Sequence, residues 1–421
     1  MVEIQRKSSL ALLGGDKVLD EGHLLRSSWG GRGLAEALSE YTGAKYVQLV
    51  TSGTAALISS LFAAGVGPGD EVLTVAYTWV ATVGAVLRVN AVPIFVDIDP
   101  RTFCMDVEDV RRKITPQTRA ILPVDFYGHP APIPELMQLA EEHGLIVIED
   151  ACQASTGEID GRKVGSLAHM TAFSWSGKPI FSSCGGGAYL TNDRKLYDRG
   201  LLAGQHPTVI MGLTDDPDVR RYASTGGMGD NMRGVGHDAL AQLLDADTRT
   251  DARIANCNHL TKRLQGIPAL TTPYVRSGYK HVFHYYTCLW DPEVYGVTRD
   301  TFVKALNAEG LYAVAYVKDS NYHFTPISKP VGADDGPLHL RAIFQERNLY
   351  GKGCPFLCPH VKNPPVYAKG DLPVSEALAE REFSLAQPDL SPPCDERDMD
   401  RIADVFEKVI EHIDELRDYR S

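Results

Sequence analysis

The sequence predicts an α/β protein built around a mostly parallel sheet. Within the first 150 residues, short runs that are apolar throughout alternate with amphipathic helical segments. This alternation is typical of parallel strands that are covered by helices on both faces. Strands are expected at 46–50, 71–76, 92–98, 120–126 and 145–148. Such sheets bind ligands beyond the carboxyl ends of their strands, so polar residues that follow these strands are candidates for a binding site.

The expected helices lie between these strands and continue into the second half of the chain. In the first half they are expected at 34–41, up to 64, up to 89, at 107–114 and at 133–143. In the second half we expect helices at 238–264, 299–309 and 397–417, and strands at 281–290 and 312–317. Residues 318–371 are rich in Gly, Pro and His and are expected to form loops. The second half therefore fits a smaller α/β domain.

Composition limits the class of protein. A chain of 421 residues with 44% hydrophobic and 23% charged residues is long enough for more than one core, so two domains are expected. A net charge of -12 argues against nucleic acid or an anionic membrane as the main partner. No apolar run reaches the roughly 18 residues of a membrane span, and the apolar run 8–13 is too short for a signal peptide. These features favour a cytoplasmic location.

The eight cysteines are scattered along the chain and do not form the pattern of a disulfide framework. The one close pair, Cys354 and Cys358, is followed by His360. It has no second ligand pair at zinc-finger spacing. We therefore interpret it as two incidental thiols in a loop, and no metal site is expected.

The turn at 51–57, Thr-Ser-Gly-Thr-Ala-Ala-Leu, joins the first expected strand to a helix. A strand, a turn of small residues and a helix N-terminus form an anion site, because free backbone N–H groups and the helix dipole converge there. Phosphate is the natural occupant. The alternative is an ordinary Ser or Thr N-cap.

Two further strand ends carry residues that suit a planar ligand. Trp79 follows the strand at 71–76 and could stack on a ring, although a tryptophan in this position can also fill the core. Asp150 follows the strand at 145–148 and could meet a ring nitrogen, with Gln153 within reach of the same ligand. The alternative for Asp150 is a capping role in the next turn.

Lys178 lies between an apolar strand at 171–175 and the glycine run at 185–187. Lysine is rarely buried unless it is paired or covalently occupied. A desolvated amine has a lowered pKa and can attack a carbonyl to form a Schiff base. Lys178 is therefore the candidate nucleophile, although a surface lysine in a loop is the simpler explanation of this window alone.

Taken together, these features match the requirements of pyridoxal 5'-phosphate. The cofactor needs an anion site, a planar platform, a carboxylate beside its pyridine nitrogen and an amine that forms a Schiff base. The chain offers all four in one order.

The chain resembles the DegT/DnrJ/StrS family of sugar aminotransferases, which have the fold-type I architecture of pyridoxal-phosphate enzymes. The resemblance implies a large domain at 33–265 with the mostly parallel sheet, a small C-terminal domain at 266–421 and an N-terminal arm at 1–32. The motifs that carry it are 51–57, 78–82, 149–154, Lys178 with its glycines, and 231–233.

The resemblance also implies roles for single residues. Lys178 and Asp150 would be the catalytic residues, with Lys178 in the Schiff base and Asp150 on the pyridine nitrogen. The other cofactor-binding residues would be Gly53, Thr54 and Ser174 at the phosphate, Trp79 and Gln153 at the ring, and Asn231 at the phosphate of the neighbouring subunit. A homodimer with shared active sites follows from the last of these roles.

The chain departs from the family pattern at several positions close to these motifs. Ser174 precedes Lys178 by four positions where five are usual, and Ser155 replaces a common His. Residues 183–186 read Ser-Cys-Gly-Gly where Gly-Glu-Gly-Gly is usual, and Met232 replaces a common Tyr. These changes concern the substrate and the subtype of the reaction.

The resemblance implies an aminotransferase that moves an amino group from glutamine or glutamate to a keto-sugar or keto-cyclitol in amino-sugar or antibiotic biosynthesis. Two alternatives stay open. One is a pyridoxal-phosphate dehydratase or an aromatising aminobenzoate synthase on the same fold. The other is a non-catalytic module that binds pyridoxal phosphate.

Overall fold

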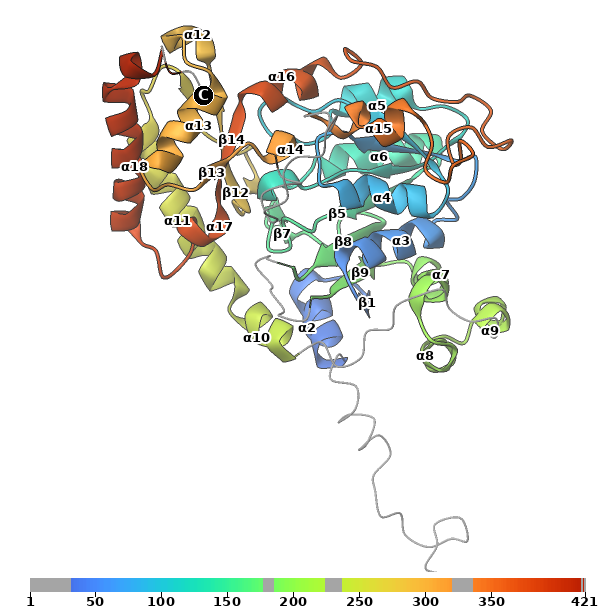
Figure 1. Cartoon of the computed structure of the whole chain (residues 1–421). Helices are drawn as coiled ribbons and strands as arrows, with labels where there is room; N and C mark the ends of the chain where they lie inside the picture. The colour runs from blue at the N-terminus through green and yellow to red at the C-terminus, as the bar shows by residue number, and fades with distance from the viewer. Residues whose placement is uncertain (1–31, 177–184, 224–236, 320–335, 418, 420–421) are drawn as a thin grey trace, which may run out of the picture.

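The computed structural model describes residues 32–176, 185–223, 237–319, 336–417 and 419. Its centre is a seven-stranded sheet with the order β1-β9-β8-β5-β4-β2-β3 (Figure 1). The strands, in that order, are Tyr46–Val50, Gly187–Thr191, Met170–Ser174, Ile146–Asp150, Thr118–Leu122, Glu71–Val75 and Val92–Val96. Strand β9 is antiparallel to both of its neighbours, and the other paired strands are parallel. The predicted mostly parallel sheet is therefore confirmed.

Helices cover both faces of this sheet because successive side chains of each strand point to opposite faces. On one face, Leu73 and Val147 pack with α5 (Val107–Lys113) and α6 (Ile133–His143). On the other face, Val72 and Ile148 pack with three helices. These are α3 (Gly53–Ala63), α4 (Val80–Arg88) and α7 (Arg194–Gly204).

A second, four-stranded sheet has the order β10-β12-β14-β13. These strands are Leu270–Thr271, Tyr285–Trp290, Glu382–Ala386 and Ala313–Val314. Leu260, Phe302 and Phe406 anchor α11 (Ala246–Leu264), α13 (Arg299–Ala308) and α18 (Glu396–Glu411) in the core beside it.

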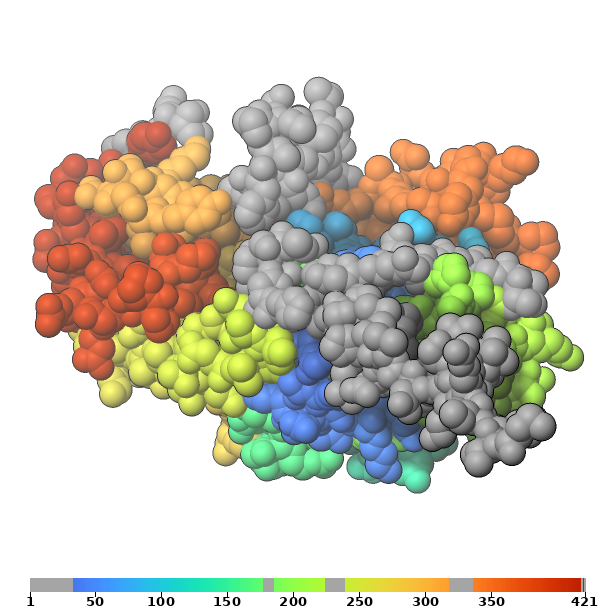
Figure 2. Space-filling view, turned by 90° about the horizontal axis from the view of Figure 1, so that it is seen from below, coloured from blue at the N-terminus to red at the C-terminus, as the bar shows by residue number. Residues whose placement is uncertain are grey.

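Helices α10 (His237–Leu244) and α11 connect the two sheets. Figure 2 shows them in yellow-green between the blue α2 (Arg32–Thr42) and the red C-terminal helix. The Tyr41 hydroxyl donates to Asp247 at 2.7 Å, which ties α2 to the start of α11. A single helix at 238–264 was expected, but Asp245 leaves the helical conformation at φ -114° and separates the two helices.

Five predicted strands are shorter than expected. Those at 71–76 and 92–98 end at Val75 and Val96. The strand at 120–126 ends at Leu122, and Phe126–Gly128 forms a 3₁₀ turn. The strand at 281–290 begins only at Tyr285. The strand at 312–317 ends at Val314, because Val317 donates its N–H to Glu382 of β14 at 3.0 Å and the chain turns into α14 (Tyr316–Asp319).

Short elements complete the described structure. A three-stranded sheet is formed by β11 (Tyr279–Lys280), β6 (Glu158–Ile159) and β7 (Arg162–Lys163). The remaining helices are α8 (Pro207–Leu213), α9 (Pro217–Ala223), α12 (Pro292–Tyr295), α15 (Ala342–Gln345), α16 (Pro373–Arg381) and α17 (Gln387–Leu390). None of the helices in the described ranges combines the length and the apolar composition needed to cross a membrane.

Residues 336–372 form a cover over one edge of the large sheet. Phe344, Phe356 and Tyr367 of this segment pack around Phe95 of β3. Cys354 and Cys358 were interpreted as two free thiols, but a tight turn brings their Cα atoms to 5.1 Å and they form a disulfide. The described residues contain no cluster of three metal-binding side chains.

Asp97 ties this cover to the large sheet through the N-terminus of α16. The N-cap residue of that helix, Leu372, has no side chain that can accept a hydrogen bond. The buried Asp97 carboxylate accepts instead from the Val374 N–H at 2.9 Å, and from the Ser375 N–H and O–H at 2.8 and 2.6 Å. A cap from a residue that directly follows β3, far away in the sequence, therefore fixes where α16 begins.

The substitution Asp97→Ala is expected to lower the free energy of unfolding by about 2 kcal/mol, because buried donors at a helix N-terminus lose their acceptor. Urea denaturation measures this loss. Asp193→Ala is the matched control, since Asp193 caps the exposed start of α7 by a local contact to Lys195. An equal or smaller loss for Asp97→Ala than for Asp193→Ala would contradict the tethering role.

Candidate functional site

A cavity of about 400 Å³ lies at the carboxyl ends of the parallel strands. Its lining includes the last residues of β5 and β8 and the segments that follow β1 and β2, as expected for a sheet of this type. Every predicted site residue that the structure describes contributes to the lining. These residues are Gly53, Thr54, Trp79, Asp150, Gln153 and Ser174.

The N-terminus of α3 forms one end of the cavity. Ser52 is its N-cap, and its side chain accepts from the Ala55 N–H at 3.1 Å. The capping alternative is thus confirmed, and the first-turn N–H groups of Gly53 and Thr54 still lie at the cavity. A Cβ on Gly53 would stand 2.5 Å from the Cys152 sulfur and 2.8 Å from the Ser174 Cβ, so only glycine allows this close packing.

Trp79 lies at the mouth of the cavity. It is the N-cap residue of α4, and 37% of its surface is exposed. The alternative that this tryptophan fills the core is therefore wrong. An exposed indole beside a cavity offers a flat apolar surface for a ring.

Asp150 is held by two donors at the end of β5. Its Oδ2 accepts from the Thr82 hydroxyl at 2.8 Å, and its Oδ1 accepts from the Cys152 N–H at 3.2 Å. The hydroxyl oxygens of Thr78 and Thr82 are 3.0 Å apart, so the two side chains are hydrogen-bonded to each other. The carboxylate is 5% exposed and has a fixed orientation in the cavity.

The side chain of Gln153 is also fixed, and its hydrogen bonds determine the positions of the amide oxygen and the amide nitrogen. Its Oε1 accepts from the Tyr127 N–H at 2.8 Å. Its Nε2 therefore points away from that backbone and donates to the Tyr316 hydroxyl at 3.4 Å. Gln153 presents a donor toward the cavity.

Two predicted residues, Lys178 and Asn231, lie outside the described residues. The described chain reaches the cavity on the way to Lys178, because both Ser174 and Ser176 contribute to the lining. The Ser176 N–H donates to the Ser174 hydroxyl at 3.4 Å.

Sequence reasoning missed the part of the lining that comes from the second half of the chain. Tyr285 begins β12, His284 directly precedes it, and Tyr316 comes from α14. His284 contacts Gln387 through Nδ1 at 3.2 Å. No local pattern marks these residues, because they reach the cavity only through the packing of the two sheets.

Glu149 adds a titratable group directly before Asp150. It is fully buried, and its Oε2 accepts from the Thr171 hydroxyl at 2.8 Å. Burial raises the pKa of Glu149 from 4.5 to about 7. The nearby Asp125 carboxyl, which is also fully buried, has its pKa raised by burial and by the charge of Glu149.

A raised pKa in the folded state makes stability depend on pH. The contribution of Glu149 is fully present below pH 4.5 and is lost as the pH rises through about 7. We expect this loss to be about 3 kcal/mol, and the substitution Glu149→Gln is expected to remove it. Urea midpoints measured from pH 4.5 to 8 test this. The exposed control Glu141→Gln should keep the wild-type dependence of the urea midpoint on pH. If Glu149→Gln keeps it too, the dependence comes from other groups.

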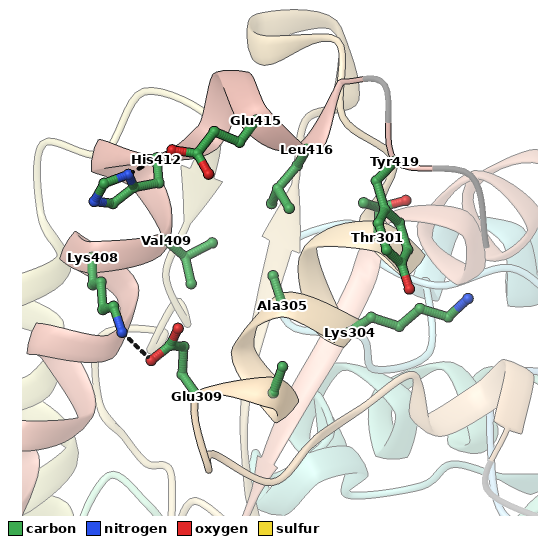
Figure 3. Close-up of a pocket in the computed structure, with 11 residues that line it drawn as sticks. Thr301, Lys304, Ala305, Glu309, Lys408, Val409, His412, Glu415, Leu416 and Tyr419 are labelled. Atoms are coloured by element: carbon green, nitrogen blue, oxygen red, sulfur yellow. Dashed lines mark hydrogen bonds and ion pairs between the residues drawn. The ribbon is translucent and has the colours of Figure 1, made fainter.

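Another hollow, of about 450 Å³, lies on the outer side of the four-stranded sheet (Figure 3). It is formed by α13, α18 and the C-terminal residues that follow. Four of its polar side chains pair with one another, since Lys408 contacts Glu309 at 2.6 Å and His412 contacts Glu415 at 2.9 Å. None of the predicted site residues that the structure describes lies there.

The fold and the cavity define a fold-type I enzyme of the pyridoxal-phosphate-dependent class. Residues 16–333 match the DegT/DnrJ/EryC1/StrS aminotransferase family. The chain belongs to this family, as predicted, and the prediction of an aminotransferase is confirmed with it.

Several relatives cover almost the whole chain, among them two aminotransferases. The UDP-N-acetyl-3-dehydro-alpha-D-glucosamine 3-aminotransferase of Acidithiobacillus ferrooxidans is 32% identical over 95% of this chain and 93% of its own length. The L-glutamine:2-deoxy-scyllo-inosose aminotransferase of Streptoalloteichus tenebrarius is 32% identical over 92% of this chain and 87% of its own. Among solved structures, DesV of S. venezuelae matches with a TM-score of 0.72 and 25% identity over 93% of this chain and 90% of its own. The family and the fold both support pyridoxal phosphate as the cofactor.

Proposed function

We propose that the protein transfers an amino group from glutamine or glutamate to a keto-sugar or keto-cyclitol in amino-sugar or antibiotic biosynthesis, with pyridoxal 5'-phosphate as its cofactor. The observation that carries this proposal is the single cavity that joins a helix N-terminus, an exposed indole and a buried carboxylate. The relative from Streptoalloteichus tenebrarius, named for glutamine and a scyllo-inosose, supports this choice of donor and acceptor.

The residues around the cavity suit this cofactor. The first turn of α3, with Gly53 and Thr54, would hold the phosphate, assisted by Ser174. The indole of Trp79 would stack on the ring. Asp150 would accept from the protonated ring nitrogen, while the Gln153 amide would donate to the ring hydroxyl oxygen. When bound, pyridoxal phosphate supplies the electron sink that lets a proton leave the α-carbon of an amino acid.

Lys178 has two tasks in this proposal. Its Nζ would hold the cofactor covalently at rest, and it would then take the proton from the α-carbon of the amino donor. The Asp150 carboxylate, oriented by Thr82 and Cys152, would keep the ring nitrogen protonated during that transfer.

The wider organisation belongs to the same proposal. We infer an arm at 1–32, a large domain at 33–265 and a small domain at 266–421. We also infer a cytoplasmic homodimer with shared active sites, in which Asn231 of one subunit reaches the phosphate site of the other. Sedimentation of the purified protein, with and without Asn231→Ala, tests the dimer and its dependence on this residue.

The proposed activity can be tested by two measurements on the purified protein loaded with pyridoxal phosphate. Absorbance is recorded before and after the addition of L-glutamine or L-glutamate, and a shift of the cofactor band is expected. Amination of 2-deoxy-scyllo-inosose and of a nucleotide-linked keto-sugar is then followed by mass spectrometry. A cofactor band that neither amino donor shifts would favour the dehydratase, the aromatising enzyme or the non-catalytic module, and no band at all would reject the enzyme.

A further inference from the structure

Tyr316 is a buried tyrosine that the roles described so far do not use. It opens α14, only 6% of its surface is exposed, and it lines the cavity together with Asp150 and Gln153. Its ring packs edge-on against Phe126 and Tyr127, at centroid distances of 5.6 and 5.5 Å. This packing fixes the position of the ring and therefore of its hydroxyl.

The direction of hydrogen bonding shows that the Tyr316 proton is available to a ligand. The Gln153 amide nitrogen can only donate, so the Tyr316 oxygen is the acceptor in their contact at 3.4 Å. Among the residues that the structure describes, no acceptor lies within hydrogen-bond distance of the remaining Tyr316 proton. A buried donor without an acceptor is costly, so a bound molecule is expected to supply one.

The Tyr316 hydroxyl stays protonated over the working range of the enzyme. Burial raises its pKa, and neighbouring Tyr285 raises it further. The group is thus a neutral donor. No lysine or arginine is found in the described part of the lining, and its polar groups include hydroxyls, an imidazole, an amide, the Cys152 thiol and the Asp150 carboxylate that is assigned to the cofactor. Such a surface suits the oxygen atoms of an uncharged polyhydroxylated ring.

We propose that Tyr316 positions the acceptor by donating a hydrogen bond from its hydroxyl to the carbonyl oxygen of the bound ketone. This inference rests on the proposed function. In this proposal the second half of the chain recognises the ketone, and the first half supplies the groups that would bind the cofactor. The geometry favours this because Gln153, itself fixed by Tyr127, holds the Tyr316 oxygen and leaves only its proton for the ligand.

The test uses Tyr316→Phe, which removes one oxygen atom and keeps the packed ring. The two half-reactions are followed separately by stopped-flow absorbance, with L-glutamine as donor and 2-deoxy-scyllo-inosose or the nucleotide-linked keto-sugar as ketone. We expect kcat/KM for the ketone to fall about 10- to 100-fold and the donor half-reaction to change less than about twofold. Tyr127→Phe is the matched control, because its hydroxyl is in the same aromatic cluster but outside the cavity lining.

Other outcomes overturn the inference in distinguishable ways. Equal losses in both half-reactions, or a changed pH titration of the cofactor band, would mean that Tyr316 serves the cofactor instead. Unchanged rates in Tyr316→Phe would reject any role. If the wild-type protein accepts the amino group but aminates neither ketone, the proposed function fails together with this inference.

Discussion

Replacement of Lys178 by alanine is expected to lower the rate of amino transfer by about 10⁴-fold. One amine serves as covalent anchor and as proton carrier in the proposed reaction, so the substitution removes both tasks at once. The measurement is the rate of the donor half-reaction with L-glutamine, together with the absorbance of the bound cofactor. The variant should still bind pyridoxal phosphate, because the helix N-terminus, Trp79 and Asp150 are retained.

Lys195→Ala is the control for this experiment, since Lys195 is an exposed lysine on α7 of the same domain. It should leave both the rate and the cofactor band unchanged. A Lys178→Ala protein that retains more than about a tenth of the wild-type rate would exclude this lysine as the proton carrier. Added methylamine offers a further check, because a small amine that restores part of the rate would identify the missing group.

The strands of the first half could be predicted from the sequence because each is a continuous apolar run between clear turn signals. The strand at 46–50 and the helix at 133–143 have the predicted bounds, and Gly144 ends that helix with φ 66°. The residues of this half that line the cavity could be predicted for the same reason. In a parallel sheet the polar residues that follow the strands meet at one edge, so Asp150 and Trp79 could be placed near each other without coordinates.

Other features depend on contacts that no local pattern records. Strand β9 is a short buried run like its neighbours, but its antiparallel direction follows from its pairing with β1 and β8. A Cβ on Gly187 would stand 2.8 Å from the Gly53 nitrogen, so this strand also shapes the end of the cavity. The cap that Asp97 gives to α16 spans 277 residues of sequence to Val374, and periodicity cannot show it.

Tyr316 illustrates the same limit at the site. Its window reads as a strand, because 312–317 is rich in residues that favour strands. The contact between the Val317 N–H and Glu382 turns the chain there and brings the tyrosine into the cavity. The sequence motifs thus predict the part of the cavity lining that comes from the first half of the chain, whereas the part from β12 and α14 emerges only from their packing against the large sheet.

The substitution Asp150→Asn is expected to lower amino transfer by about 10³-fold. An amide of the same shape can keep a hydrogen bond to Thr82, but it carries no negative charge to hold the ring nitrogen in its protonated form. The expected loss lies in the donor half-reaction, with little change in the affinity for pyridoxal phosphate. Stopped-flow rates and equilibrium dialysis of the cofactor measure the two effects separately. A variant within about fivefold of the wild-type rate would contradict the assignment of Asp150.

Thr82 allows the charge of Asp150 to be separated from its orientation. Thr82→Val removes the hydroxyl that donates to Oδ2 at 2.8 Å and keeps the volume of the side chain, so we expect a loss of about tenfold. Thr82→Ser restores a hydroxyl at the same position and should recover most of that loss. If Thr82→Val and Thr82→Ser have equal rates of amino transfer, the hydroxyl does not position the carboxylate. If Thr82→Val loses as much activity as Asp150→Asn, the orientation of the carboxylate matters as much as its charge. The hydroxyls of Thr78 and Thr82 are then needed to position Asp150 for the reaction.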